Sequence, residues 1–139
     1  MTFEDVIKSL GSEFGADLEP EGGVAAFTVS GEGDAAVEIV VREVEDGDCA
    51  DISADLGELP AGGSEELMMA MLEANHLFGG TGGSALSVEG SRAKLERRVP
   101  LTELGRGDGA GVLMPFLGMV RKWRAAVADV GGDAEWISG

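Results

Sequence analysis

The sequence has little of what stabilises secreted proteins or carries out most catalysis. Among its 139 residues there is one cysteine, one histidine and no tyrosine. The lone Cys49 can form neither an internal disulfide nor a CxxC zinc or redox pair. We therefore expect a protein of a reducing compartment with no cofactor and no structural metal.

Long apolar runs are also missing. The first fifteen residues, MTFEDVIKSLGSEFG, include acidic side chains and no unbroken apolar stretch, which is unlike a signal peptide. No segment approaches the roughly 18 apolar residues of a membrane span. The sequence thus predicts a cytoplasmic protein with no membrane partner.

Basic residues are scarce as well. Ten Lys and Arg stand against 26 Asp and Glu, a net charge of −16, which repels nucleic-acid phosphates and anionic lipids at long range. Nucleic acid is therefore not an expected partner. This acidity either keeps an apolar binding surface from self-associating or is the ordinary acidity of a bacterial cytosolic protein.

The apolar residues are numerous enough, at 44%, for one globular domain covering residues 1–139. Helical spacing from Phe3 to Phe14 predicts a first helix, with Thr2 as a possible N-cap. Period-two alternation predicts strands over residues 24–30, 37–41 and 50–56, with turns at residues 31–34 and 45–48. These three strands form an antiparallel meander.

The second half of the chain is predicted to contain a helix, a hairpin of two strands and a last helix. A helix runs from about Ser64 to His76, and a hairpin follows over residues 84–88 and 93–99, turning at Gly90. After a glycine-rich loop at residues 105–111, a last helix runs over residues 113–127 with Pro115 in its first turn. The order α-β-β-β-α-β-β-α predicts an α+β fold with one antiparallel sheet.

The predicted helix before His76 is apolar around most of its circumference. Such a helix needs cover on more than one side, and in so small a domain the second cover is expected from another subunit. The side chains concerned are Leu67, Met68, Met69, Met71 and Leu72.

Three runs resemble one known family. They are LEANHLFGGTGGSALSVEG at residues 72–90, KLERRVPL at residues 94–101 and VLMPFLGMVRKWR at residues 112–124. They are similar to the Tir chaperone (CesT-like) family, the class I chaperones of type III secretion. The shared features are a Leu-Phe-Gly turn at residues 77–79, Thr-Gly-Gly at residues 81–83, a strand ending in Pro100 and Leu101, and Trp123 near the basic end of the last helix. Length, acidity and element order agree with this resemblance.

The resemblance implies a non-enzymatic homodimer of type III secretion chaperone-like fold. It would bind the N-terminal segment of a secreted effector, hold it extended and keep it ready for export. The implied dimer interface is Leu67, Met68, Met69, Met71, Leu72 and Leu86. The implied effector-binding residues are Phe3, Ile7, Leu10, Phe27 and Val29, although the same residues must also supply core.

Other sites are weaker interpretations. Residues 105–110, GRGDGA, match the GxGxxA form of a dinucleotide-binding turn, but the preceding strand belongs to a hairpin and Asp108 would face the phosphates. The acidic run around Asp51 lacks the glycine and glutamate of a calcium loop. His76, beside Glu73, is expected to cap a helix end and not to act as a base or metal ligand.

Two alternatives to the chaperone remain at this point. One is a stand-alone regulator or adaptor of the same fold that serves no secretion system. The other, from a different class, is a small enzyme or nucleotide-binding protein that uses the loop at residues 105–111.

Overall fold

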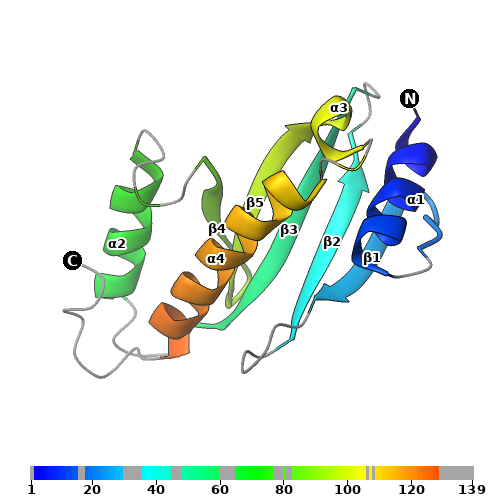
Figure 1. The fold of residues 1–139 in the computed structure, drawn as a ribbon. Helices are drawn as coiled ribbons and strands as arrows, with labels where there is room; N and C mark the ends of the chain where they lie inside the picture. Colours follow the sequence, from blue (N-terminus) through cyan, green and yellow to red (C-terminus); the bar gives the residue numbers. More distant parts are fainter. Residues whose placement is uncertain are drawn as a thin grey trace. The chain divides into compact units, whose positions relative to one another are not determined.

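A computed structural model of the chain describes residues 2–15, 18–29, 36–44, 48–59, 65–76, 80, 83–105, 107 and 109–128. Its strands form one five-stranded antiparallel sheet in the order β1-β2-β3-β5-β4, which confirms the predicted α+β class (Figure 1). The elements in chain order are α1 (Phe3–Phe14), β1 (Val24–Val29), β2 (Val37–Glu43), β3 (Cys49–Glu58), α2 (Glu65–Asn75), β4 (Ala85–Glu89), β5 (Arg92–Pro100), α3 (Leu101–Leu104) and α4 (Gly109–Ala128).

The chain divides into two compact units. The first contains Met1–Ala54 and Arg97–Pro115, and the second contains Asp55–Glu96 and Phe116–Gly139. Strands β3 and β5 and helix α4 therefore each contribute residues to both units.

Helix α1 in the first unit begins at the predicted N-cap. The Thr2 hydroxyl accepts the Asp5 N–H at 3.1 Å, and the Asp5 carboxylate accepts the Thr2 N–H at 3.2 Å, which together form a capping box. Gly15 ends the helix in the left-handed conformation, at φ +71°. The predicted first helix is confirmed at both ends.

The meander in the same unit follows the predicted alternation. Val37, Ile39 and Val41 of β2 are buried, and Val41 lies opposite the buried Ile52 of β3. Their neighbours along each strand face the other side of the sheet, because side chains alternate along a strand. The predicted turn at residues 31–34 lies outside the described residues, and so does the predicted turn at residues 45–48 except for Asp48.

The second unit contains the predicted hairpin and helix. Gly90, at φ +61°, makes the turn between β4 and β5, and Leu86 lies opposite Leu95. Helix α2 begins at Glu65, one residue after the expected start. Both elements are confirmed.

Two expectations about the end of the chain are wrong. A one-turn helix, α3, follows Pro100 directly, with Leu101 and Leu104 buried. Helix α4 begins at Gly109 and not at Leu113, so Pro115 lies in its second turn. Because glycines at positions 109 and 111 are typical of a loop, the sequence predicted a loop where the helix begins.

Gly109 is glycine because α1 passes close to it. A Cβ at this position would collide with the Leu10 side chain. The Glu13 carboxylate accepts the N–H groups of Gly109 and Ala110 at 3.1 and 2.8 Å, which satisfies two of the free donors at the start of α4. Helix α1 thus caps α4.

Arginines of β5 pair with the acidic residues of β3. In the second unit the Arg92 Nε lies 3.0 and 3.1 Å from the two carboxylate oxygens of Asp55. In the first unit the Arg98 Nε lies 2.8 Å from Asp51. Arginine therefore balances the charges of Asp51 and Asp55 on β3. The described residues contain no cluster of metal-binding side chains.

Hydrogen bonds from Arg92 hold the pKa of Asp55 below its usual value of about 3.9. A carboxylate with a lowered pKa stabilises the fold above the unfolded pKa, and this contribution is lost as pH falls through the folded pKa. We expect Arg92→Ala to raise the pKa of Asp55 toward the usual value in an NMR titration, and to lower stability slightly at neutral pH but not at a pH below the folded pKa of Asp55, where the carboxyl is protonated in both proteins. Lys94→Ala, which removes the partner of Glu89, serves as control; an unchanged Asp55 pKa in Arg92→Ala would contradict the assignment.

Candidate protein-binding site

Helix α2 carries more apolar side chains than its own unit covers. Leu67, Met71 and Ala74 are buried, whereas Met68, Met69 and Leu72 are 38%, 58% and 66% exposed. Exposed side chains of this size are unfavourable in water unless another surface covers them. The uncovered side of α2 is therefore a candidate contact for another protein.

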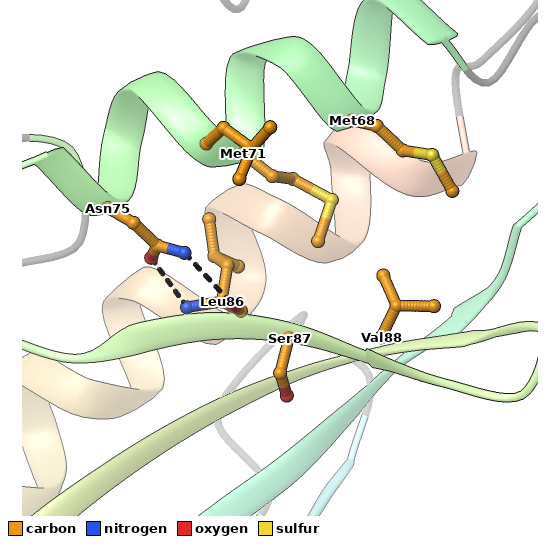
Figure 2. Close-up of a pocket in the computed structure, with 7 residues that line it drawn as sticks. Met68, Met71, Asn75, Leu86, Ser87 and Val88 are labelled. Atoms are coloured by element: carbon orange, nitrogen blue, oxygen red, sulfur yellow. Dashed lines mark hydrogen bonds between the residues drawn. The ribbon is translucent and has the colours of Figure 1, made fainter.

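A groove lies between α2 and β4. It encloses about 210 Å³, and Figure 2 shows Met68 and Met71 on its helix side and Leu86 and Val88 on its strand side. Methionine side chains are flexible and polarisable, so they adapt to different partners. Its lining is mostly apolar and consists of Met68, Met71, Leu72, Asn75, Leu86, Ser87 and Val88.

One side chain fixes the distance between the two walls. The Asn75 amide nitrogen donates to the Leu86 carbonyl at 2.9 Å, and its oxygen accepts the Leu86 N–H at 2.7 Å (Figure 2). A flipped amide would place donor against donor and acceptor against acceptor, so the two bonds also fix the orientation of the amide. Asn75 therefore ties the end of α2 to the second residue of β4.

Gly80, which lies beyond the end of α2, is held by a second set of bonds. The Gly80 N–H donates to the Ala74 carbonyl at 3.1 Å, and the Trp123 indole N–H donates to the Gly80 carbonyl at 3.2 Å. A Cβ on Gly80 would lie 2.7 Å from the Ala74 Cβ, so only glycine fits. The buried Trp123 of α4 thus anchors the chain where α2 ends.

The six predicted interface residues separate into two groups. Met68, Met69 and Leu72 are exposed and available to a second subunit. Leu67, Met71 and Leu86 are buried within their own unit. Their role in a dimer stays a prediction.

The predicted effector-binding residues lie mostly in the core of the first unit. Phe3, Ile7, Leu10 and Phe27 are buried, and Val29 is half-buried. Ile7 is fully buried, so a charge placed there would disturb the core before it reached a bound effector. The apolar stripe of a helix is the same whether it faces a core or a groove, so spacing alone could not separate the two. A role in effector binding stays a prediction for these five.

The edge of β1 that faces away from β2 carries backbone N–H and C=O groups that could bond another strand. The Gly23 carbonyl accepts the Glu43 N–H at 2.7 Å and so faces β2, which places the backbone groups of Val24, Ala26 and Thr28 on the outer side by alternation. The Val24 N–H donates to the Glu21 carbonyl at 3.1 Å, and the Val24 carbonyl accepts the Glu21 N–H at 2.9 Å. Ala26 and Thr28 remain as two consecutive outward-facing positions on the edge strand.

The dinucleotide-binding alternative meets a physical obstacle. In such sites the phosphates bind free N–H groups at a helix N-terminus. Here the Glu13 carboxylate already accepts from Gly109 and Ala110 at the start of α4. A phosphate would have to displace a carboxylate of the protein itself.

His76 and Cys49, the two remaining candidates, belong to no group of metal-binding side chains within the described residues. His76 is exposed directly after α2, and Cys49 is half-buried at the start of β3. In the part of the chain that the structure describes, no helix is both long and apolar enough to cross a membrane.

The comparisons with known proteins agree with the fold and with the resemblance. The model of the Tir chaperone protein (CesT) family matches residues 5–124. The chain belongs to this family. No curated protein matches the sequence. Trp123, the aromatic residue that the resemblance singled out near the end of the last helix, donates its indole N–H to the Gly80 carbonyl.

Solved structures share the fold at low sequence identity. A chain from the Yersinia pestis type III secretion chaperone SycH in complex with a fragment of YscM2 has a TM-score of 0.68 and 14% identity, covering 88% of this CesT family chain and 99% of its own. A chain from the Pseudomonas aeruginosa ExoU–SpcU complex has a TM-score of 0.63 and 17% identity, covering 89% and 96%. A chain from the HopA1–SchA chaperone–effector complex has a TM-score of 0.63 and 12% identity, covering 87% and 91%.

Sequence reasoning missed Asn75 and Gly80 as determinants of the site, and Glu13 as the cap of α4. The Gly-Gly pair after α2 was a usable signal for a close approach. The bonds from Asn75 and Glu13 join residues 11 and about 96 positions apart, and no local pattern indicates them.

Gly80→Ala is expected to destabilise the protein by about 1 to 3 kcal/mol, because the new methyl group overlaps Ala74. Gly118→Ala is the matched control: it lies in α4 with nothing within 4 Å of the added Cβ, and it should stabilise by about 0.5 to 1 kcal/mol. Denaturant unfolding measures both. Equal effects of the two substitutions would contradict the close approach at Gly80.

Proposed function

We propose that this protein is a type III secretion chaperone that binds the N-terminal segment of a secreted effector as a homodimer and keeps it competent for export. Membership of the CesT family carries the proposal. The uncovered apolar side of α2 and the open edge of β1 support it, since each offers a surface for another polypeptide. The protein would act in the cytoplasm, by binding and not by catalysis.

The neighbours in fold support a protein client. One contains the chaperone SycH with a stable fragment of YscM2, and another is a chaperone–effector complex, HopA1–SchA. By analogy, this chain would hold part of a protein and not a small ligand.

The second subunit would cover α2. A symmetric dimer places the same patch on both partners, so the exposed Met68, Met69 and Leu72 of one subunit would meet their counterparts. Val88, 43% exposed beside Met68, extends this patch onto β4 (Figure 2). An apolar contact suits the acidic chain, because it needs no oppositely charged surface.

Met69→Glu is expected to convert the dimer to a monomer, because it places a charge in an apolar contact with no partner. Light scattering across a dilution series gives the mass. Met114→Glu is the matched control, since Met114 is 52% exposed on α4 and the substitution is the same. A dimer retained by Met69→Glu, or a monomer formed by both variants, would contradict this interface.

The client would add to the sheet at β1. An extended segment pairs with a free strand edge through backbone hydrogen bonds, while its alternate side chains reach neighbouring apolar positions. Ala26 and Thr28 supply the outward N–H and C=O groups, and the half-buried Val29 lies next to them. Such recognition uses mainly backbone and so tolerates different client sequences.

Thr28→Pro removes one outward N–H and no bond to β2, because proline lacks only the group on the open side. We expect at least a tenfold loss of client recovered with the tagged protein, at unchanged dimer mass. Thr28→Val keeps the N–H and should recover the client fully. Full recovery with Thr28→Pro would show that the client does not pair with β1.

A further inference from the structure

Glu38 of β2 is an exposed carboxylate without a cation beside it. It lies on the same face of the sheet as Asp51 of β3, whose carboxylate is 2.8 Å from the Arg98 Nε. The Glu38 carboxylate, by contrast, forms no ion pair or hydrogen bond with any of the residues that the structure describes. A cation supplied by another chain would therefore not have to displace a partner at Glu38.

Glu38 is one strand away from the open edge of β1. In the register of the two strands, Thr28 pairs with Glu38 and Ala26 pairs with the uncharged Val40. Thr28 and Ala26 carry the outward backbone groups, and both side chains are small and exposed. Neighbouring strands are about 4.8 Å apart, so a residue added beside Thr28 would lie about 10 Å from Glu38. A lysine or arginine is long enough to reach the Glu38 carboxylate across Thr28.

The other face of an added strand would meet apolar side chains. Phe27 and Val29 of β1 lie on this face, and the ring of Phe27 packs against that of Phe14 of α1, with centroids 6.0 Å apart. Phe14 and Val29 are only half-buried, so apolar neighbours would cover them further. Side chains alternate along a strand, so the residues before and after the one beside Thr28 would point to this face.

We propose that Glu38 is a specificity-determining residue for the client strand, which carries a Lys or Arg between two apolar residues. The cation lies beside Thr28, and the two apolar side chains lie beside Phe27 and Val29. An acidic client residue beside Thr28 is disfavoured, because like charges on neighbouring strands weaken pairing. This inference rests on the proposed strand addition at β1 and adds the chemistry of the segment that binds there.

The test selects binders from a displayed library of random peptides of about ten residues, with the full-length protein as bait. Wild type should enrich peptides in which a Lys or Arg stands between apolar residues. Fluorescence anisotropy should then show that the most enriched peptide binds at least fivefold more tightly than the same peptide with Glu in place of the cation. This difference should shrink in about 1 M salt, where charges on the surface are screened.

Three variants locate the charge that is recognised. Glu38→Lys should reverse the preference between the two peptides, and Glu38→Gln, which keeps the size of the side chain, should reduce it to less than half. Glu103→Lys is the matched control, because it changes the net charge equally at an exposed position of α3 in the same unit. It should keep the preference of the wild type, which separates recognition by Glu38 from the general attraction of an acidic protein for cations.

An unchanged preference in Glu38→Lys and Glu38→Gln would overturn the proposal, and so would enriched peptides without a cation. Thr28→Pro separates this failure from failure of the proposed function, because it removes an outward N–H of the edge. If Thr28→Pro binds the enriched peptide as tightly as wild type, or if wild type enriches no peptide, strand addition at β1 fails as well. If Thr28→Pro loses the peptide while both Glu38 variants bind as wild type does, only the role of Glu38 fails.

Discussion

Helix α2 must be covered on two sides, and its own unit covers one. Leu67 and Met71 face inward while Met68, Met69 and Leu72 remain in solvent. The helix cannot turn to reduce this exposure, because Asn75 is bonded to β4 and the following Gly80 is bonded to Ala74 and Trp123. The apolar side is thus held outward in a defined orientation, ready for a partner.

The net charge of the chain and the bonding of its sheet edges both limit nonspecific self-association through the exposed apolar surface of α2. A net charge of −16 keeps separate copies apart at long range, so only a contact with good apolar fit brings them together. At the two edges of the sheet, some outward backbone groups are already hydrogen-bonded and are not open to another chain. The Asn75 amide occupies the outward backbone groups of Leu86 on β4, and Glu21 occupies those of Val24 on β1.

The fold was largely predictable because its periodic signals are strong. Strands β2 and β3 alternate cleanly, and the stripe of α1 begins at a capping residue. The start of α4 was not predictable, since Gly109 is there to let Leu10 approach and looks like a loop residue in isolation. One-turn helix α3 is too short to show a period.

The site was predictable in part. Apolar residues around most of the circumference of α2 indicate an exposed contact from the sequence alone, and three of these side chains are indeed uncovered. Ile7 and Phe27 could not be assigned to core or groove, because both environments select the same residues. The role of Asn75 could not be predicted from the sequence, because it depends on how closely α2 approaches Leu86 in the fold.

The most direct test of a client-holding dimer is native mass spectrometry of the tagged protein purified from the cells that produce it. Two copies of this chain with one copy of a protein bound through its N-terminal segment is the predicted result. A monomer that carries a nucleotide or other small ligand and no protein would contradict it.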